Sequence, residues 1–250
     1  LAWRAHWRTT GTRQLACYGA AWLAYLAGML CKSPVTVLPL LIGVTDLFFP
    51  TEGDRWRPKQ ALRLLPFLAA ALPFQALHVT HAMHGLISPA LPGITWLKTA
   101  LTMSRIGTGY LAQLAGLLPG RAHYRPEWSE GWGGAELACT TLLLALAAGT
   151  AWLVLQALRG RLPARLALLG WGLAWTAVAM APASNLVYHS LVLRADRYLL
   201  LPSLGFCLIA AAGLEGLWAS RRAAVLALFG LLVLWDVRAC ADWMGNRAVC

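Results

Sequence analysis

The chain contains 250 residues, of which 59% are hydrophobic and only 12% are charged, and its formal net charge is +11. Globular domains average roughly 25% charged residues, so a soluble protein of this length could not cover its surface, and the apolar content also excludes intrinsic disorder. The excess of cations would suggest nucleic acid in a soluble chain. In an apolar chain it is better explained by cytoplasmic topology signals and contacts with headgroups or an anionic ligand, so no nucleic-acid partner is expected.

Six apolar blocks of about 17–24 residues are long enough to cross a bilayer as helices, and a shorter seventh block follows. In chain order the blocks cover residues 14–31, 34–50, 62–79, 135–158, 166–182, 198–218 and 223–237. The intervening stretch 94–118 is helical in pattern but carries Lys98, Arg105 and Gln113, so we expect it to lie at the interface or to re-enter. The predicted fold is an all-α polytopic membrane bundle with about seven spans plus this one helix.

Cations predict the orientation of the bundle. Twelve of the 21 cations fall in one set of short connections: Arg4, Arg8, Arg13, Arg55, Arg57, Lys59, Arg63, Arg159, Arg161, Arg165, Arg221 and Arg222. The positive-inside rule places these connections in the cytoplasm, and the connections 80–134 and 183–197 outside it. If residues 94–118 crossed the membrane fully, Arg159, Arg161 and Arg165 would lie outside the cytoplasm, against the positive-inside rule.

The block from Pro182 to Ser203 places Arg194, Asp196 and Arg197 directly before an apolar helix. Charged residues at bilayer depth are costly and usually pair or line a cavity. One interpretation is an interfacial arginine that reaches the headgroups while Asp196 neutralises a neighbour. The other is that Arg197 or Arg194 binds an anionic group, with phosphate favoured because the forked guanidinium donors match its geometry.

Lys32 lies in the tight connection Met29-Leu-Cys-Lys-Ser-Pro34, on the same predicted outer face as Arg197. A lone loop lysine is usually only solvated. Two cations that converge at the outer ends of helices would instead form a pocket for a lipid phosphate. We therefore predict that Lys32, Arg197 and Arg194 form the phosphate-binding site.

Two segments carry a resemblance to a known family. Cys31-Lys-Ser-Pro-Val-Thr-Val-Leu38 is similar to an element of the transmembrane-and-tetratricopeptide-repeat O-mannosyltransferases and their bacterial relatives. Pro182-Ala-Ser-Asn-Leu186, followed by Ala195-Asp-Arg-Tyr-Leu-Leu-Leu-Pro-Ser-Leu-Gly-Phe-Cys207, resembles a second and more specific element. A weaker similarity covers Tyr110, Leu117-Leu-Pro119 and Tyr124, so the resemblance runs over most of the chain in the right order.

The resemblance implies a GT-C fold and a glycosyltransferase that uses a polyprenyl-phosphate sugar on the non-cytoplasmic face. In eukaryotic members the donor is dolichyl-phosphate mannose and the acceptor is a Ser or Thr hydroxyl of a protein. Members carry acidic catalytic residues in the first outer loop and tetratricopeptide repeats after the last span. Neither is matched here, so residues 1–250 are expected to be a partial membrane domain without its catalytic base.

The resemblance also implies roles for individual residues. Arg197 would anchor the donor phosphate with Lys32 as the second cation, Asp196 would orient Arg197, and Tyr198 would belong to the same pocket. Asn185, Tyr188 and His189 would reach sugar hydroxyls, although Asn185 is equally a helix cap. Ser33 and Leu200 depart from the residues that most relatives have at these positions.

Other functions remain open on the sequence. A transporter or flippase for a lipid-linked anion would use a similar basic pocket, and a non-catalytic scaffold would only position attached repeats. His78, His81 and His84 share a helix face but have no carboxylate nearby, so no metal and no cofactor is expected. A composition rich in Ala, Leu, Arg and Trp favours a bacterial inner membrane, with the ER membrane as the eukaryotic equivalent. The acceptor is expected to be a protein or a glycan.

Overall fold

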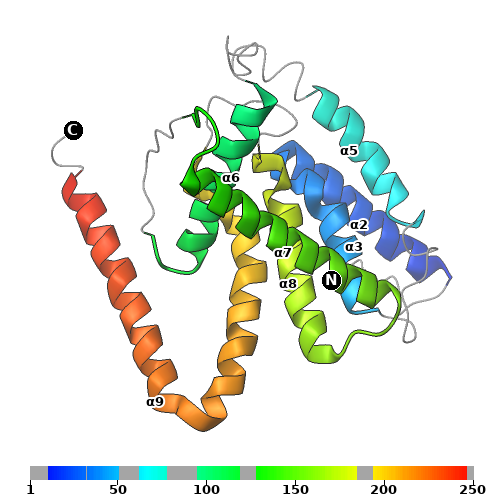
Figure 1. Cartoon of the computed structure of the whole chain (residues 1–250). Coiled ribbons are helices and arrows are strands. Elements are labelled where there is room, and N and C mark those ends of the chain that lie inside the picture. The colour runs from blue at the N-terminus through cyan, green and yellow to red at the C-terminus, as the bar shows by residue number, and fades with distance from the viewer. Residues whose placement is uncertain are drawn as a thin grey trace. The chain divides into compact units, whose positions relative to one another are not determined.

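The computed structural model describes residues 11–31, 33–50, 62–77, 95–118, 128–184 and 194–246. Within these ranges every regular element is a helix and none is a strand (Figure 1). The chain divides into two compact units: Leu1–Ile87 with Thr150–Pro182, and Ser88–Gly149 with Ala183–Cys250. The predicted all-α class is therefore confirmed for the described residues.

The first unit is built from helices whose bounds follow the apolar blocks. They are α2 (Thr12–Cys31), the 3-10 helix η1 (Ser33–Val37), α3 (Leu38–Phe48), α5 (Leu65–Leu77), the last turns of α7 (Gly134–Leu158) and α8 (Ala164–Met180). The short 3-10 turn η3 (Ala181–Ala183) follows α8, and the first unit ends within it at Pro182. A proline at the start of α3 suits that position, because its missing N–H would have no partner in the first turn.

Aromatic packing joins α2 to α5 in the first unit. Tyr25 and Met29 are one turn apart on α2, so both side chains lie on the same face and are buried against Phe67 of α5. The ring of Phe67 lies 5.5 Å from that of Tyr25 and meets the ring of Tyr18 edge-on at 5.6 Å. Such tilted and edge-on pairs are favourable beyond the area that they bury.

A second core joins α3, α8 and the end of α7. Gly170 of α8 faces Phe48 of α3 and Leu153 of α7 so closely that a Cβ atom would lie 2.5 Å from the Phe48 ring. The indole N–H of Trp171 donates a 3.0 Å hydrogen bond to the Thr45 hydroxyl. The absence of a side chain at Gly170 therefore lets the three helices approach, and Trp171 ties α8 to α3.

The second unit contains α6 (Trp96–Leu114), the first part of α7, the 3-10 helix η4 (Asp196–Leu199) and α9 (Leu200–Asn246). Thr95 caps α6, because its hydroxyl accepts a hydrogen bond from the Lys98 N–H. The long helix α9 bends at Arg221, whose backbone angles are not helical, and Figure 1 shows two arms meeting there. The bend falls between the two apolar blocks predicted at 198–218 and 223–237.

Two of the described helices, α2 and α7, are long and apolar enough to cross a membrane. Only 11% and 6% of their apolar windows are buried inside the protein, so little of their apolar surface is covered by other residues. Such surface favours association with a membrane. Four other predicted spans correspond to the shorter apolar helices Val35–Phe48, Leu65–Phe74, Ala164–Met180 and Leu200–Glu215, and α6 is long enough but not apolar enough, so helix length alone does not establish seven spans.

Candidate functional site

The candidate site is a row of polar contacts along α6, within the second unit. The helix places side chains four, seven, eleven and fifteen residues after Lys98 on one stripe, which is roughly 22 Å long at 1.5 Å per residue. The stripe consists of Lys98, Thr102, Arg105, Gly109 and Gln113. The four polar side chains among them, those of Lys98, Thr102, Arg105 and Gln113, each contact a residue outside α6.

The first contact is an ion pair at the start of the helix. The Lys98 ammonium lies 2.8 Å from the Glu130 carboxylate, whose side chain is 85% exposed. The hydrogen bond and the charge of Lys98 hold the pKa of Glu130 below its ordinary value of 4.5. Because the pair is solvated, it contributes little to stability.

The lowered pKa gives a pH dependence with a definite sign. The carboxylate of Glu130 stabilises the folded state above its unfolded pKa, and this contribution is lost as the pH falls from about 4.5 through the lower folded pKa. We expect NMR titration of the labelled carboxyl to show a raised pKa in Lys98→Met and a still lowered one in Lys98→Arg. An unchanged pKa in Lys98→Met would contradict the ion pair.

The second contact is a network around Ser129, which is buried. Its N–H donates a 3.0 Å hydrogen bond to the Thr102 hydroxyl, and its own hydroxyl donates a 3.2 Å hydrogen bond to Glu136. The Arg105 guanidinium binds the same Glu136 oxygen at 3.3 Å. Glu136 lies in the first turn of α7, where the helix dipole favours a negative charge. The network therefore fixes the loop before α7 on α6.

The third contact brings the predicted site residue Arg194 onto the stripe. Its Nη2 donates a 2.8 Å hydrogen bond to Gln113 Oε1, and its Cζ lies 5.4 Å from the centre of the Tyr110 ring. A Cβ at Gly109 would lie 3.1 Å from Nη1, so the guanidinium lies close against the backbone of α6. The amide of Gln113 accepts this hydrogen bond without adding a compensating charge.

The next residue is held through its main chain. The Ala195 N–H donates a 2.8 Å hydrogen bond to the Tyr110 hydroxyl, which in turn donates to the Ala195 carbonyl at 3.2 Å. The same carbonyl accepts a 3.0 Å hydrogen bond from the Tyr198 N–H inside η4. Tyr110 is 1% exposed and its bonds to Ala195 are partly buried, which shields them from competing water.

The structure places some of the predicted site residues and leaves others outside its described part. Arg194 is brought onto Tyr110 and Gln113, and Tyr198 lies half-buried in η4. Asp196 and Arg197 are described only as backbone of η4. Lys32, Asn185, Tyr188, His189 and the histidines at 78, 81 and 84 lie outside the described residues, so the convergence of Lys32 with Arg197 stays a prediction.

Sequence reasoning did not assign a role to Glu136, Ser129 or the Tyr110 hydroxyl. A signal was present for Tyr110 and Gln113, since residues three apart on a helix share a face. Nothing in the local pattern identifies Ala195 as the partner of Tyr110, because 85 residues separate them.

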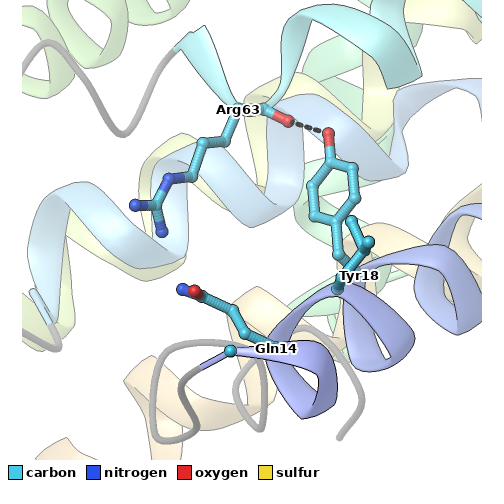
Figure 2. Close-up of a pocket in the computed structure, with 5 residues that line it drawn as sticks. Gln14, Tyr18 and Arg63 are labelled. Atoms are coloured by element: carbon cyan, nitrogen blue, oxygen red, sulfur yellow. Dashed lines mark hydrogen bonds between the residues drawn. The ribbon is translucent and has the colours of Figure 1, made fainter.

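The first unit also contains a shallow, wide-open pocket of about 270 Å³, lined by Gly11, Gln14, Leu15, Tyr18 and Arg63. Figure 2 shows the Gln14 amide and the Arg63 guanidinium extending on the same side of the Tyr18 ring. The Tyr18 hydroxyl donates a 2.8 Å hydrogen bond to the Arg63 carbonyl, which joins the start of α2 to the residues before α5. None of these residues was predicted as a site.

Comparisons of the chain with protein-family models, with curated proteins and with solved structures give no match.

Proposed function

We propose that this protein is a membrane glycosyltransferase. It would move a sugar such as mannose from a polyprenyl-phosphate donor to a protein Ser or Thr hydroxyl, or to a glycan hydroxyl, on the non-cytoplasmic face. The observation that carries the proposal is that the Arg194–Ala195 segment is held on α6 directly before η4 and the apolar start of α9. A cationic segment in this position suits the anionic head of a lipid.

The membrane architecture that we propose is a GT-C-like bundle with about seven spans. The two helices of spanning length, α2 and α7, support it, and so do the four shorter apolar helices that coincide with the predicted blocks 34–50, 62–79, 166–182 and 198–218. The ion pairs along α6 are a further support, because Lys98 and Arg105 each pair with a carboxylate. Charged residues in membrane proteins are typically paired in this way.

The chemistry requires two groups. A base must take the proton of the acceptor hydroxyl, and cations must stabilise the charge that develops on the departing polyprenyl phosphate. In the proposal, Arg197 and Lys32 bind the phosphate directly and Arg194 contributes through the segment that it holds on α6, while Asp196, Tyr198, Asn185, Tyr188 and His189 contribute to the sugar pocket. The base is expected outside these residues, and no cofactor is required.

The proposal is tested by binding to the whole chain in nanodiscs of phosphatidylcholine. We expect a polyprenyl phosphate to bind at least about tenfold more tightly than the polyprenol of the same length, because charge-assisted hydrogen bonds to the phosphate add roughly 1.5–3 kcal/mol. Native mass spectrometry with both lipids measures the ratio. Equal affinities would overturn the proposal. Movement of a fluorescent polyprenyl phosphate across the membrane of proteoliposomes, without sugar transfer, would favour a flippase.

A further inference from the structure

The Tyr110 hydroxyl makes an unusual pair of contacts, since it binds both main-chain groups of one residue. It accepts from the Ala195 N–H at 2.8 Å and donates to the Ala195 carbonyl at 3.2 Å. A buried tyrosine hydroxyl needs a hydrogen-bond partner, and here both partners belong to one residue that is 85 positions away in the chain. The pair fixes the position and the orientation of the peptide groups on both sides of Ala195.

Ala195 in turn begins η4. Its extended backbone and the hydrogen bond from the Tyr198 N–H to its carbonyl make it the N-cap of this short helix. Arg197 is the second residue of η4, so at most about 7 Å of chain separates it from the anchored residue. Fixing Ala195 therefore restricts where the backbone of Arg197 can lie.

Arg194 provides the second anchor of the segment. Its guanidinium binds Gln113, lies beside the Tyr110 ring and packs against Gly109, where a larger residue would contact it. All three contacts come from one turn of α6. The side chain of Arg194 and the main chain of Ala195 are thus held by the same short stretch of helix.

We propose that Tyr110 and Gln113 are positioning residues that set where Arg197 meets the phosphate of a polyprenyl-phosphate donor. This inference rests on the proposed function. The two side chains act through the segment that they hold and do not touch the donor. Arg194, in this arrangement, serves the site by binding α6.

Tyr110→Phe tests the inference because it removes the hydroxyl and keeps the ring. We expect amide exchange at Ala195, measured by hydrogen exchange and mass spectrometry, to rise about 2- to 12-fold, which corresponds to the loss of one partly buried hydrogen bond. The affinity of the whole chain for polyprenyl phosphate should fall by a similar factor. Tyr18→Phe is the matched control, since it removes a tyrosine hydroxyl that also binds a main-chain carbonyl. The control should keep wild-type exchange at Ala195 and wild-type affinity.

Substitutions at Gln113 separate positioning from direct phosphate binding. Gln113→Met removes the acceptor for Arg194 and should raise exchange in residues 194–199 and weaken lipid binding. Gln113→Glu keeps an acceptor in the same place and should restore both to wild-type values. Loss of affinity in Gln113→Glu with native exchange would overturn the inference and assign the charge of Arg194 to the phosphate.

Three further outcomes would each overturn either the positioning role or the proposed function. Faster exchange in Tyr110→Phe with unchanged affinity overturns the positioning role but leaves the proposed function intact. A polyprenyl phosphate that binds no better than its alcohol to the wild-type chain overturns the proposed function itself. A loss of affinity in Tyr18→Phe as large as that in Tyr110→Phe would show a general effect on folding, and the inference would fail.

Discussion

Replacement of Arg197 by alanine is expected to weaken binding of a polyprenyl phosphate to the whole chain about 10- to 150-fold. The estimate follows from the loss of hydrogen bonds between a charged donor and a phosphate, which contribute roughly 1.5–3 kcal/mol. Arg197→Lys should recover only part of the affinity, because an ammonium cannot form the two parallel hydrogen bonds of a guanidinium. Titration in nanodiscs of phosphatidylcholine measures the dissociation constants.

The control for this prediction is Arg161→Ala, which removes an exposed arginine from the short connection between α7 and α8. Its affinity should equal that of the wild type. A double-mutant cycle with Lys32→Ala then tests whether the two cations share one phosphate, since residues that contact the same group give non-additive losses. Strictly additive losses would contradict a common pocket, and wild-type affinity in Arg197→Ala would remove Arg197 from the site.

A large effect on stability is expected at Gly170. Gly170→Ala adds a Cβ that would lie 2.5 and 2.9 Å from two atoms of the Phe48 ring and 3.1 Å from Leu153. Overpacking of this kind usually costs about 1–3 kcal/mol. Thermal unfolding in detergent should therefore show a lower midpoint than the wild type, although alanine is the better helix former.

Gly149→Ala is the matched control, because Gly149 is also inside a helix and a Cβ there meets nothing within 4 Å. This variant should be as stable as the wild type or slightly more stable. Phe48→Leu combined with Gly170→Ala should recover part of the lost stability, since the smaller side chain removes the atoms nearest to the new methyl group. A midpoint in Gly170→Ala equal to that of Gly149→Ala would contradict the close packing.

The helices were predictable from the sequence because apolar blocks and their polar ends are local features. The bend at Arg221 illustrates this, since the pair Arg221 and Arg222 interrupts two apolar blocks at the point where α9 leaves helical geometry. The starts of helices were less predictable. The predicted span 62–79 corresponds to α5, which begins at Leu65.

The contacts along α6 could not be derived in the same way. Lys98, Arg105 and Gln113 suggested a helix that lies at the membrane interface or re-enters, which stays a prediction, and the structure gives each of the three a partner within the second unit. Those partners lie 31 to 81 residues away in the chain. Periodicity identifies the face of a helix that carries polar groups, but it does not identify what covers that face.

The same limit applies to the candidate site. The sequence singled out residues 194–197 because charges before an apolar helix are costly. In the structure this segment leads into η4, and α9 follows directly. It did not foresee that the guanidinium of Arg194 binds Gln113. A side-chain role depends on three-dimensional neighbours, which spacing along the chain does not reveal.

The contact between α3 and α8 has a consequence for the behaviour of the protein in lipid. The small residues Ala167, Gly170 and Ala174 are three and four residues apart, so they lie on one face of α8. All three pack against neighbouring side chains. Dispersion attraction between such closely fitted surfaces does not depend on the expulsion of water, and neither does the hydrogen bond from Trp171 to Thr45. This helix pair is therefore suited to stay associated when it is surrounded by lipid acyl chains, although these are as apolar as its own side chains.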